Sequence, residues 1–158
     1  MIDDKAFEML LSEAESGDVI SQNSLAARYA TGDGVDKDLD QTIYWYKKAS
    51  LNDDPDAFYN LALMYLLGEG VDKDDKIARI NLNEAIECGS SDACLVLAEA
   101  YENGNLFDLN IDFNKAAKFY LKATLFGSIK GLKGIASLIE QKKINSTQFL
   151  QAAKKLSN

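Results

Sequence analysis

The 158-residue chain contains no histidine, and this absence removes most of the common routes to catalysis. Serine–histidine and cysteine–histidine pairs, histidine general bases and the commonest metal ligand are all excluded. Carboxylates acting alone remain, but the pair Asp33 and Asp36 returns as Glu69 and Asp72 with the repeat described below. A pair that recurs with the repeat is typical of loop structure, so we expect no enzyme activity and no cofactor.

The sequence also lacks any run of about 18 apolar residues, the length that a membrane-spanning helix needs. Its first five residues, Met1 to Lys5, have neither the basic region nor the apolar stretch of a secretory signal. We therefore expect a cytoplasmic protein that does not contact the membrane.

Basic residues are fewer than acidic ones, 17 against 25, which gives a net charge of −8. The imbalance is uneven, because residues 1–120 carry 24 acidic and 10 basic side chains, whereas residues 121–158 carry one acidic and seven basic side chains. Acidity of this size disfavours nucleic acid, whose phosphates would be repelled. It favours a basic protein or peptide as the partner.

Cysteine and proline are rare, with two and one residues respectively. Cys94 aligns with ordinary helix positions in the repeat, so we expect Cys88 and Cys94 to be buried free thiols. A calcium loop is also not expected. Asp36 and Asp38 resemble its beginning, but Gln41 stands where glycine is required and Lys47 where a bidentate glutamate is required.

What the sequence does contain is one stretch that occurs twice. Residues 32–38, Gly-Asp-Gly-Val-Asp-Lys-Asp, return 36 residues later as residues 68–74, Gly-Glu-Gly-Val-Asp-Lys-Asp. A fixed period of this size is typical of a solenoid, in which each unit buries its apolar face against its neighbours.

The same period aligns the residues of a first helix in each unit. The aligned sets are Leu25, Leu61, Leu97 and Ile135; Ala26, Ala62, Ala98 and Ala136; and Tyr29, Tyr65 and Tyr101. Their spacing puts them on one helical face, and the small alanine permits close approach of a second helix. The predicted N-caps are Asp18, Asp54, Ser90 and Ser128, with Pro55 at a first helical position and Gly17, Gly89, Gly127 and Asp53 ending the helices before them.

Second helices align equally well. Their predicted core sets are Thr42, Ala78 and Ala116; Tyr46, Leu82 and Tyr120; and Ala49, Ala85 and Ala123. Trp45 aligns with Phe119, so we expect it in the core and not in a stacking platform for bases or sugars. Asp38 and Asp74 are predicted to cap these helices. The third loop is two residues longer, and the sequence leaves open whether its Leu106, Phe107 and Leu109 are exposed.

The predicted fold is therefore all-α, a solenoid of about three and a half helix-turn-helix repeats in a single domain. It consists of a half-repeat cap at 5–17, repeats at 18–53, 54–89 and 90–127, and a degenerate C-terminal repeat at 128–158.

The pattern Ala-x-x-x-Leu-Ala-x-x-Tyr-x-x-Gly-x-Gly-Val-x-x-Asp, followed by Trp-Tyr-Lys-Lys-Ala at 45–49, resembles the Sel-one-like repeat, a relative of the tetratricopeptide repeat. This resemblance implies a right-handed α/α superhelix that acts as a non-catalytic adaptor or scaffold of bacterial type and binds proteins. Some secreted members join two helices by a disulfide, but the first cysteine would then stand at Ile86. Two alternatives stay open: an immunity protein that neutralises a basic toxin or secreted effector, and a regulatory subunit of an enzyme.

The resemblance also implies a binding surface on the concave face formed by the first helices. The residues that match its positions are Asn23, Ala27, Tyr59, Leu63, Leu66, Leu95, Glu99, Glu102 and Lys133. Tyr59, Leu63 and Leu66 form a second apolar stripe beside the packing stripe of their helix. Such a stripe is either buried against other helices or part of a partner-binding groove.

Overall fold

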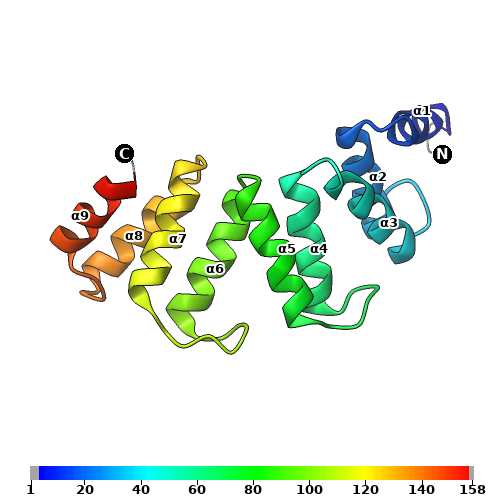
Figure 1. The fold of residues 1–158 in the computed structure, drawn as a ribbon. Helices are drawn as coiled ribbons and strands as arrows, with labels where there is room; N and C mark the ends of the chain where they lie inside the picture. Colours follow the sequence, from blue (N-terminus) through cyan, green and yellow to red (C-terminus); the bar gives the residue numbers. More distant parts are fainter. Residues whose placement is uncertain (1–3, 157–158) are drawn as a thin grey trace. The chain divides into compact units, whose positions relative to one another are not determined.

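The computed structural model describes the chain from residue 4 to residue 156, and this part consists of helices joined by turns and loops, without β-strands (Figure 1). The helices are α1 (Asp4–Glu15), α2 (Val19–Thr31), α3 (Leu39–Ser50), α4 (Pro55–Leu67), α5 (Asp75–Glu87), α6 (Ser91–Asn103), α7 (Phe113–Leu125), α8 (Ile129–Glu140) and α9 (Ser146–Leu156). Within the described residues, no helix has the length and apolar character needed to cross a membrane.

The chain forms two compact units, Met1–Cys88 and Gly89–Asn158. Unit 1 contains α1 to α5, and unit 2 contains α6 to α9. In unit 1, α2 packs on α3 and α4 packs on α5, while in unit 2 α6 packs on α7 (Figure 1). These are the helix pairs that the 36-residue period predicts.

Helix starts in unit 1 follow the predicted capping pattern. The Asp18 carboxylate accepts a hydrogen bond of 2.7 Å from the Ser21 amide, and the Asp54 carboxylate accepts one of 2.7 Å from the Ala57 amide. Pro55 is the first residue of α4, where its missing amide hydrogen is not needed. Each capping aspartate satisfies an amide that has no partner inside its helix.

The duplicated loops reverse the chain between first and second helices. Gly32 and Gly68 end α2 and α4 in the left-handed conformation, with φ of 76° and 71°. Asp38 and Asp74 cap α3 and α5, as predicted. Gly70 has a second reason to be glycine, because a Cβ there would lie 2.7 Å from the Cβ of Leu39 on α3. The loop of the second repeat therefore packs directly on the first repeat.

The core of unit 1 is built from the aligned positions. Leu25, Ala26 and Ala62 have no exposed surface, and Trp45 is only 5% exposed. The prediction that Trp45 is a core residue is confirmed. Its Nε1 has no hydrogen-bond partner among the described residues, so the indole contributes by apolar packing.

The helix starts of unit 2 follow the same capping pattern, except at α8. Ser90 caps α6 through the Ala93 amide at 3.2 Å, and Asp112 caps α7 through the Lys115 amide at 3.0 Å. Ser128 occupies the predicted N-cap position of α8, but its side chain makes no capping hydrogen bond. The predicted side-chain cap at Ser128 was therefore wrong.

Helix α8 packs on α7 through glycines. A Cβ at Gly131 would lie against the carbonyl oxygen of Tyr120 and 2.7 Å from Oγ1 of Thr124, and a Cβ at Gly134 would lie 2.5 Å from the Tyr120 ring. Ala136, which we predicted on the packing face with Ala26, is exposed. The prediction fails because Gly131, Ile135 and Leu138, all buried, define a packing face on α8 that is rotated away from Ala136.

The long third loop is neither fully buried nor fully exposed. Leu106, Phe107 and Leu109 are each partly buried, and Phe107 and Asp108 adopt positive φ of 57° and 51°. Cys88 and Cys94 do not form a disulfide, as predicted; Cys94 is buried as expected, whereas Cys88 is only partly buried. Burial, with Asp53 as the next cause, raises the pKa of the Cys88 thiol.

Candidate functional site

The predicted apolar stripe lies on α4 in unit 1. Tyr59, Leu63 and Leu66 are each partly buried, so part of each side chain remains accessible after folding. Leu67, next along the helix, is 67% exposed. Asp56 is the only charged residue of α4, which makes this the least polar helix surface of unit 1. The accessible part of the stripe can contact an apolar side chain of a partner.

The two predicted residues on α2 differ in what they contact. Asn23 donates a hydrogen bond of 2.9 Å to Oδ1 of Asp54, the same oxygen that accepts the Ala57 amide at the start of α4. Asn23 therefore joins α2 to the N-cap of α4. Ala27 is exposed and available at the surface.

In unit 2 the predicted residues lie on α6 and α8. Glu99 and Lys133 are exposed, whereas Leu95 is only 7% exposed and offers a partner little surface. Glu102, at the C-terminal end of α6, is partly buried.

Glu102 is held by two hydrogen bonds within unit 2. The Tyr120 hydroxyl donates to its Oε2 at 2.8 Å, and Lys143 Nζ donates to its Oε1 at 3.2 Å. Lys143 Nζ also lies 4.8 Å from the centroid of the Phe113 ring. Burial, followed by the hydrogen bond to Glu102 and its charge, raises the pKa of Tyr120. The Glu102 carboxylate is thus engaged in linking α6, α7 and the segment after α8.

Sequence reasoning did not find this network. Tyr120 aligned with Tyr46 as a core residue, and nothing in the repeat pattern identified Lys143, because it follows α8 where the regular loop is shortened. The hydroxyl of a tyrosine at a core position was the available signal, since a buried hydroxyl needs a partner.

Two grooves on second helices were also missed. A groove of about 420 Å³ on α7 is lined by Lys115, Lys118, Phe119, Leu121, Lys122 and Leu125. One of about 360 Å³ on α3 is lined by Tyr44, Lys47, Lys48, Ser50 and Leu51. The two grooves are 74 residues apart, which is two periods of the repeat, and they therefore occupy equivalent positions on second helices. Phe119 had aligned with the core residue Trp45, but the other large apolar residues of the two grooves stand outside the aligned core sets, and they were the available signal.

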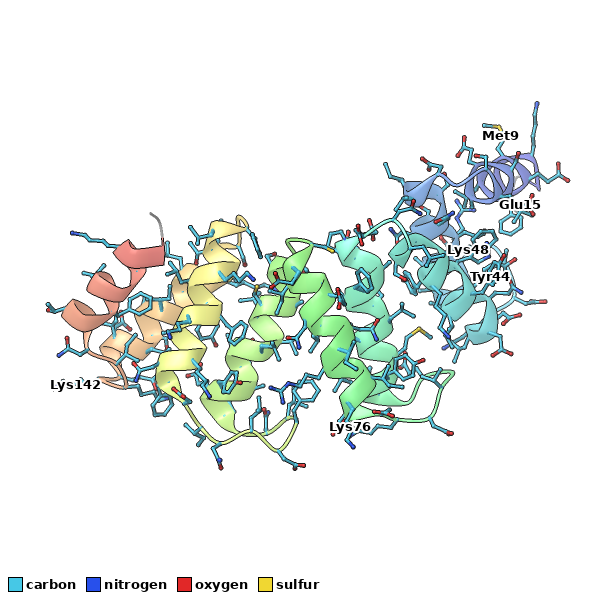
Figure 2. All side chains as sticks on the ribbon, viewed as in Figure 1. Met9, Glu15, Tyr44, Lys48, Lys76 and Lys142 are labelled. Atoms are coloured by element: carbon cyan, nitrogen blue, oxygen red, sulfur yellow. The ribbon has the colours of Figure 1, made fainter. Side chains whose placement is uncertain are left out.

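Tyr44 and Lys48 project from the same side of α3 (Figure 2), and Lys48 Nζ lies 5.6 Å from the centroid of the Tyr44 ring. Tyr44 also contacts Trp45 edge to face, with ring centroids 5.0 Å apart. Among the described residues, no group of three or more acidic, cysteine or histidine side chains is arranged to hold a metal ion.

Comparison of the chain with models of known protein families gives the residue ranges of its repeats. The family model described as Sel1 repeat matches three times, at residues 19–54, 55–90 and 91–125. Among curated protein sequences, none matches this chain.

Solved structures of the same repeat type match most of the chain. A Sel1 repeat protein from Oxalobacter formigenes is 32% identical, with a TM-score of 0.71, over 84% of this chain and 98% of that one. A protective antigen of uropathogenic Escherichia coli with an SLR fold is 29% identical, with a TM-score of 0.74, over 87% of this chain but only 29% of the antigen.

Cysteine-rich protein B of Helicobacter pylori shares the fold, with a TM-score of 0.61 at 19% identity over 82% of this chain and 92% of that one. These neighbours are bacterial, and Sel1 repeats form an α/α solenoid fold that generally mediates protein interactions without catalysis. Three consecutive matches covering most of its length show that the chain belongs to the Sel1 repeat family.

Proposed function

We propose that this chain is a non-catalytic adaptor that binds a protein or peptide through the first-helix face of unit 1, with Tyr59, Leu63 and Leu66 as anchors. The observation that carries the proposal is that these three large side chains stay partly accessible on a helix with Asp56 as its only charge. Their apolar surface would contribute about 25 cal/mol per Å² removed from water, before the costs of association.

The charge of unit 1 supports a basic partner. Residues 1–88 carry 19 acidic and 8 basic side chains, a net charge of −11. The negative electrostatic potential of unit 1 raises the rate at which a cationic segment associates with it, and salt weakens this effect. Binding would therefore combine an apolar anchor on α4 with steering by the surrounding carboxylates. We place this adaptor in the cytoplasm, without a metal, a cofactor or nucleic acid as its ligand.

The other predicted contact residues would contribute to partner binding in different ways. Ala27 would lie at the edge of the contact, and Asn23 would act by holding α4 in position through Asp54. In unit 2, Glu99 and Lys133 are accessible enough to contact a partner. Leu95 and Glu102 would contribute through the packing of α6, because one is buried and the other is hydrogen bonded.

The test is capture of the native partner from an extract of the source organism by tagged wild-type chain, followed by titration of the purified partner. We expect the double substitution Tyr59→Ala with Leu63→Ala to weaken the affinity by about tenfold or more. Leu51→Ala is the matched control, since Leu51 is 81% exposed at the C-cap of α3, outside the proposed face. Circular dichroism would verify that the helices persist.

Unchanged affinity of the double variant for the purified partner would reject the α4 face. An equal loss for Leu51→Ala would reject it too, because the partner would then bind across the second helices. Affinity that rises as salt is added would contradict the basic partner while leaving the anchors in place.

A further inference from the structure

The groove on α7 combines apolar residues with positive charge. Phe119, Leu121 and Leu125 line it together with three lysines, and Leu125 is 64% exposed. Its volume of about 420 Å³ is sufficient to receive side chains of a partner. An exposed apolar surface with charges of one sign around it is typical of an interaction site.

One side of the groove is held in place by aromatic contacts. The Phe119 ring stacks on Tyr101 of α6, with centroids 5.7 Å apart and planes inclined by 10°. Lys115 Nζ lies 5.1 Å from the centroid of the Tyr101 ring and 3.7 Å from a carboxylate oxygen of Asp112. The Phe119 ring is therefore held by α6 before any partner binds, which lowers the entropic cost of binding.

The charge of α7 is unusual in this acidic chain. The helix Phe113–Leu125 contains Lys115, Lys118 and Lys122 and no acidic residue. Unit 2 as a whole carries 6 acidic and 9 basic side chains, a net charge of +3, against −11 for unit 1. The surroundings of the groove thus favour an anionic partner, the opposite of the partner expected for α4.

We propose that the α7 groove binds an acidic amphipathic helix of a partner protein. Apolar side chains of that helix would pack on Phe119, Leu121 and Leu125, and its carboxylates would pair with the lysines. From Lys115 to Leu125 the groove extends over ten residue steps of α7, which corresponds to about 15 Å, or about three turns of a partner helix. This is recognition of a helix in a groove, with anchors spaced by three or four residues.

An anionic membrane fits the same charges less well. The chain as a whole carries a net charge of −8, which an anionic bilayer repels. A lipid headgroup would use the lysines but not the hollow lined by Phe119, Leu121 and Leu125, whereas a helix with spaced apolar side chains uses both.

Helix α3 provides an internal control. Its groove has a similar volume and also contains two lysines, but the unit around it is strongly acidic. We therefore expect an acidic helix to prefer α7 to α3, although the two grooves occupy equivalent places in the repeat.

The probe is a fluorescent synthetic peptide of about four helical turns with leucines at spacings of three and four and glutamates between them. A second peptide has the same composition in scrambled order, and a third has lysines in place of the glutamates. Fluorescence anisotropy would measure binding to the full chain. We expect the amphipathic acidic peptide to bind at least about tenfold more tightly than the other two.

Lys118→Glu should then weaken binding of the acidic peptide by about tenfold, and Leu125→Ala by several-fold. Lys47→Glu on α3, which changes the net charge equally, should have little effect. Tyr59→Ala with Leu63→Ala should leave this binding intact, so a failure of the α4 proposal would not be mistaken for a failure here.

Three results would overturn the α7 proposal. Absence of peptide binding is one, and equal losses from Lys118→Glu and Lys47→Glu are another, since they would show attraction by net charge alone. The third is tighter, Lys118-dependent binding to anionic phosphatidylglycerol vesicles than to the peptide, which would identify a lipid surface as the ligand.

Discussion

The two units of the chain use the same helical period but are held together differently. In unit 1 the loops repeat almost residue for residue, and Asn23 joins neighbouring first helices by a hydrogen bond to the cap residue Asp54. In unit 2 the third loop is irregular, and a half-buried ion pair between Lys143 and Glu102, shared with Tyr120, links its helices. The period therefore specifies which helices pair, and individual residues decide how each pair is fixed.

The two units also differ in the small residues that allow their helices to pack closely. In unit 1 small residues such as Ala26 and Ala62 allow first helices to pack closely. In unit 2, Gly131 and Gly134 allow α8 to approach the backbone and ring of Tyr120 more closely than an alanine would permit. Unit 2 thus depends on glycine in the middle of a helix, where glycine costs about 1 kcal/mol relative to alanine.

The largest expected effect comes from Gly131→Ala. Helix propensity alone would stabilise the variant by up to about 1 kcal/mol, but the new Cβ would meet backbone atoms of α7. We expect a net loss of about 2 to 3 kcal/mol in the free energy of unfolding, measured with urea. Ser24→Ala, on an exposed position of α2, should change it by less than about 0.5 kcal/mol. A more stable Gly131→Ala variant would show that α7 and α8 are not closely packed.

A smaller effect is expected from Gly70→Ala in unit 1. The substitution forces alanine into a φ of +72° and places its Cβ 2.7 Å from that of Leu39, and we expect a loss of about 2 kcal/mol. Gly17→Ala is the control, because Gly17 also has positive φ but its Cβ would have no neighbour within 4 Å. Equal losses in urea denaturation would mean that the contact between the loop and α3 contributes nothing.

The smallest effect at neutral pH is expected from Tyr120→Phe, which removes the hydrogen bond to Glu102 and should cost about 1 kcal/mol. The pH dependence of the free energy of unfolding tests the role of Tyr120 more specifically. The folded-state pKa of Tyr120 is raised above its ordinary value of 10.0, by burial first and by Glu102 second. Folding therefore favours the protonated phenol, so its contribution is fully present below pH 10 and is lost as the pH rises above that value.

Tyr120→Phe should accordingly reduce the loss of stability above pH 10, as followed by urea denaturation at a series of alkaline pH values. Tyr46→Phe is the counterpart in unit 1, where burial and then the charge of Asp56 also raise the pKa. An alkaline profile unchanged by Tyr120→Phe would argue against the link between Tyr120 and Glu102.

Much of the fold could be predicted because it depends on local rules. Caps at Asp18, Asp54 and Ser90, the glycine-containing loops and the buried alanines all follow from helix geometry and short spacings. The face that α8 presents to α7 could not be predicted in this way. It depends on which small residue meets Tyr120, a contact between helices that the 36-residue alignment does not contain.

The candidate site was less predictable for the same reason. Periodicity identified Tyr59, Leu63 and Leu66 as a stripe, but their remaining accessibility is a property of the folded unit. Glu102 matched the family position on α6, yet its carboxylate is engaged by Tyr120 and by Lys143, which lies 41 residues away in the sequence.

The hydrogen bond between Asn23 and Asp54 also makes the order of the repeats matter. At the position equivalent to Asn23 the second repeat has Tyr59, and at the position equivalent to Asp54 the third repeat has Ser90. Exchanging the first two repeats would therefore separate the amide from the carboxylate that it binds, even though every helix kept its own residues. The repeats of this chain share one period, but the hydrogen bond between Asn23 and Asp54 makes the first two specific for each other as neighbours.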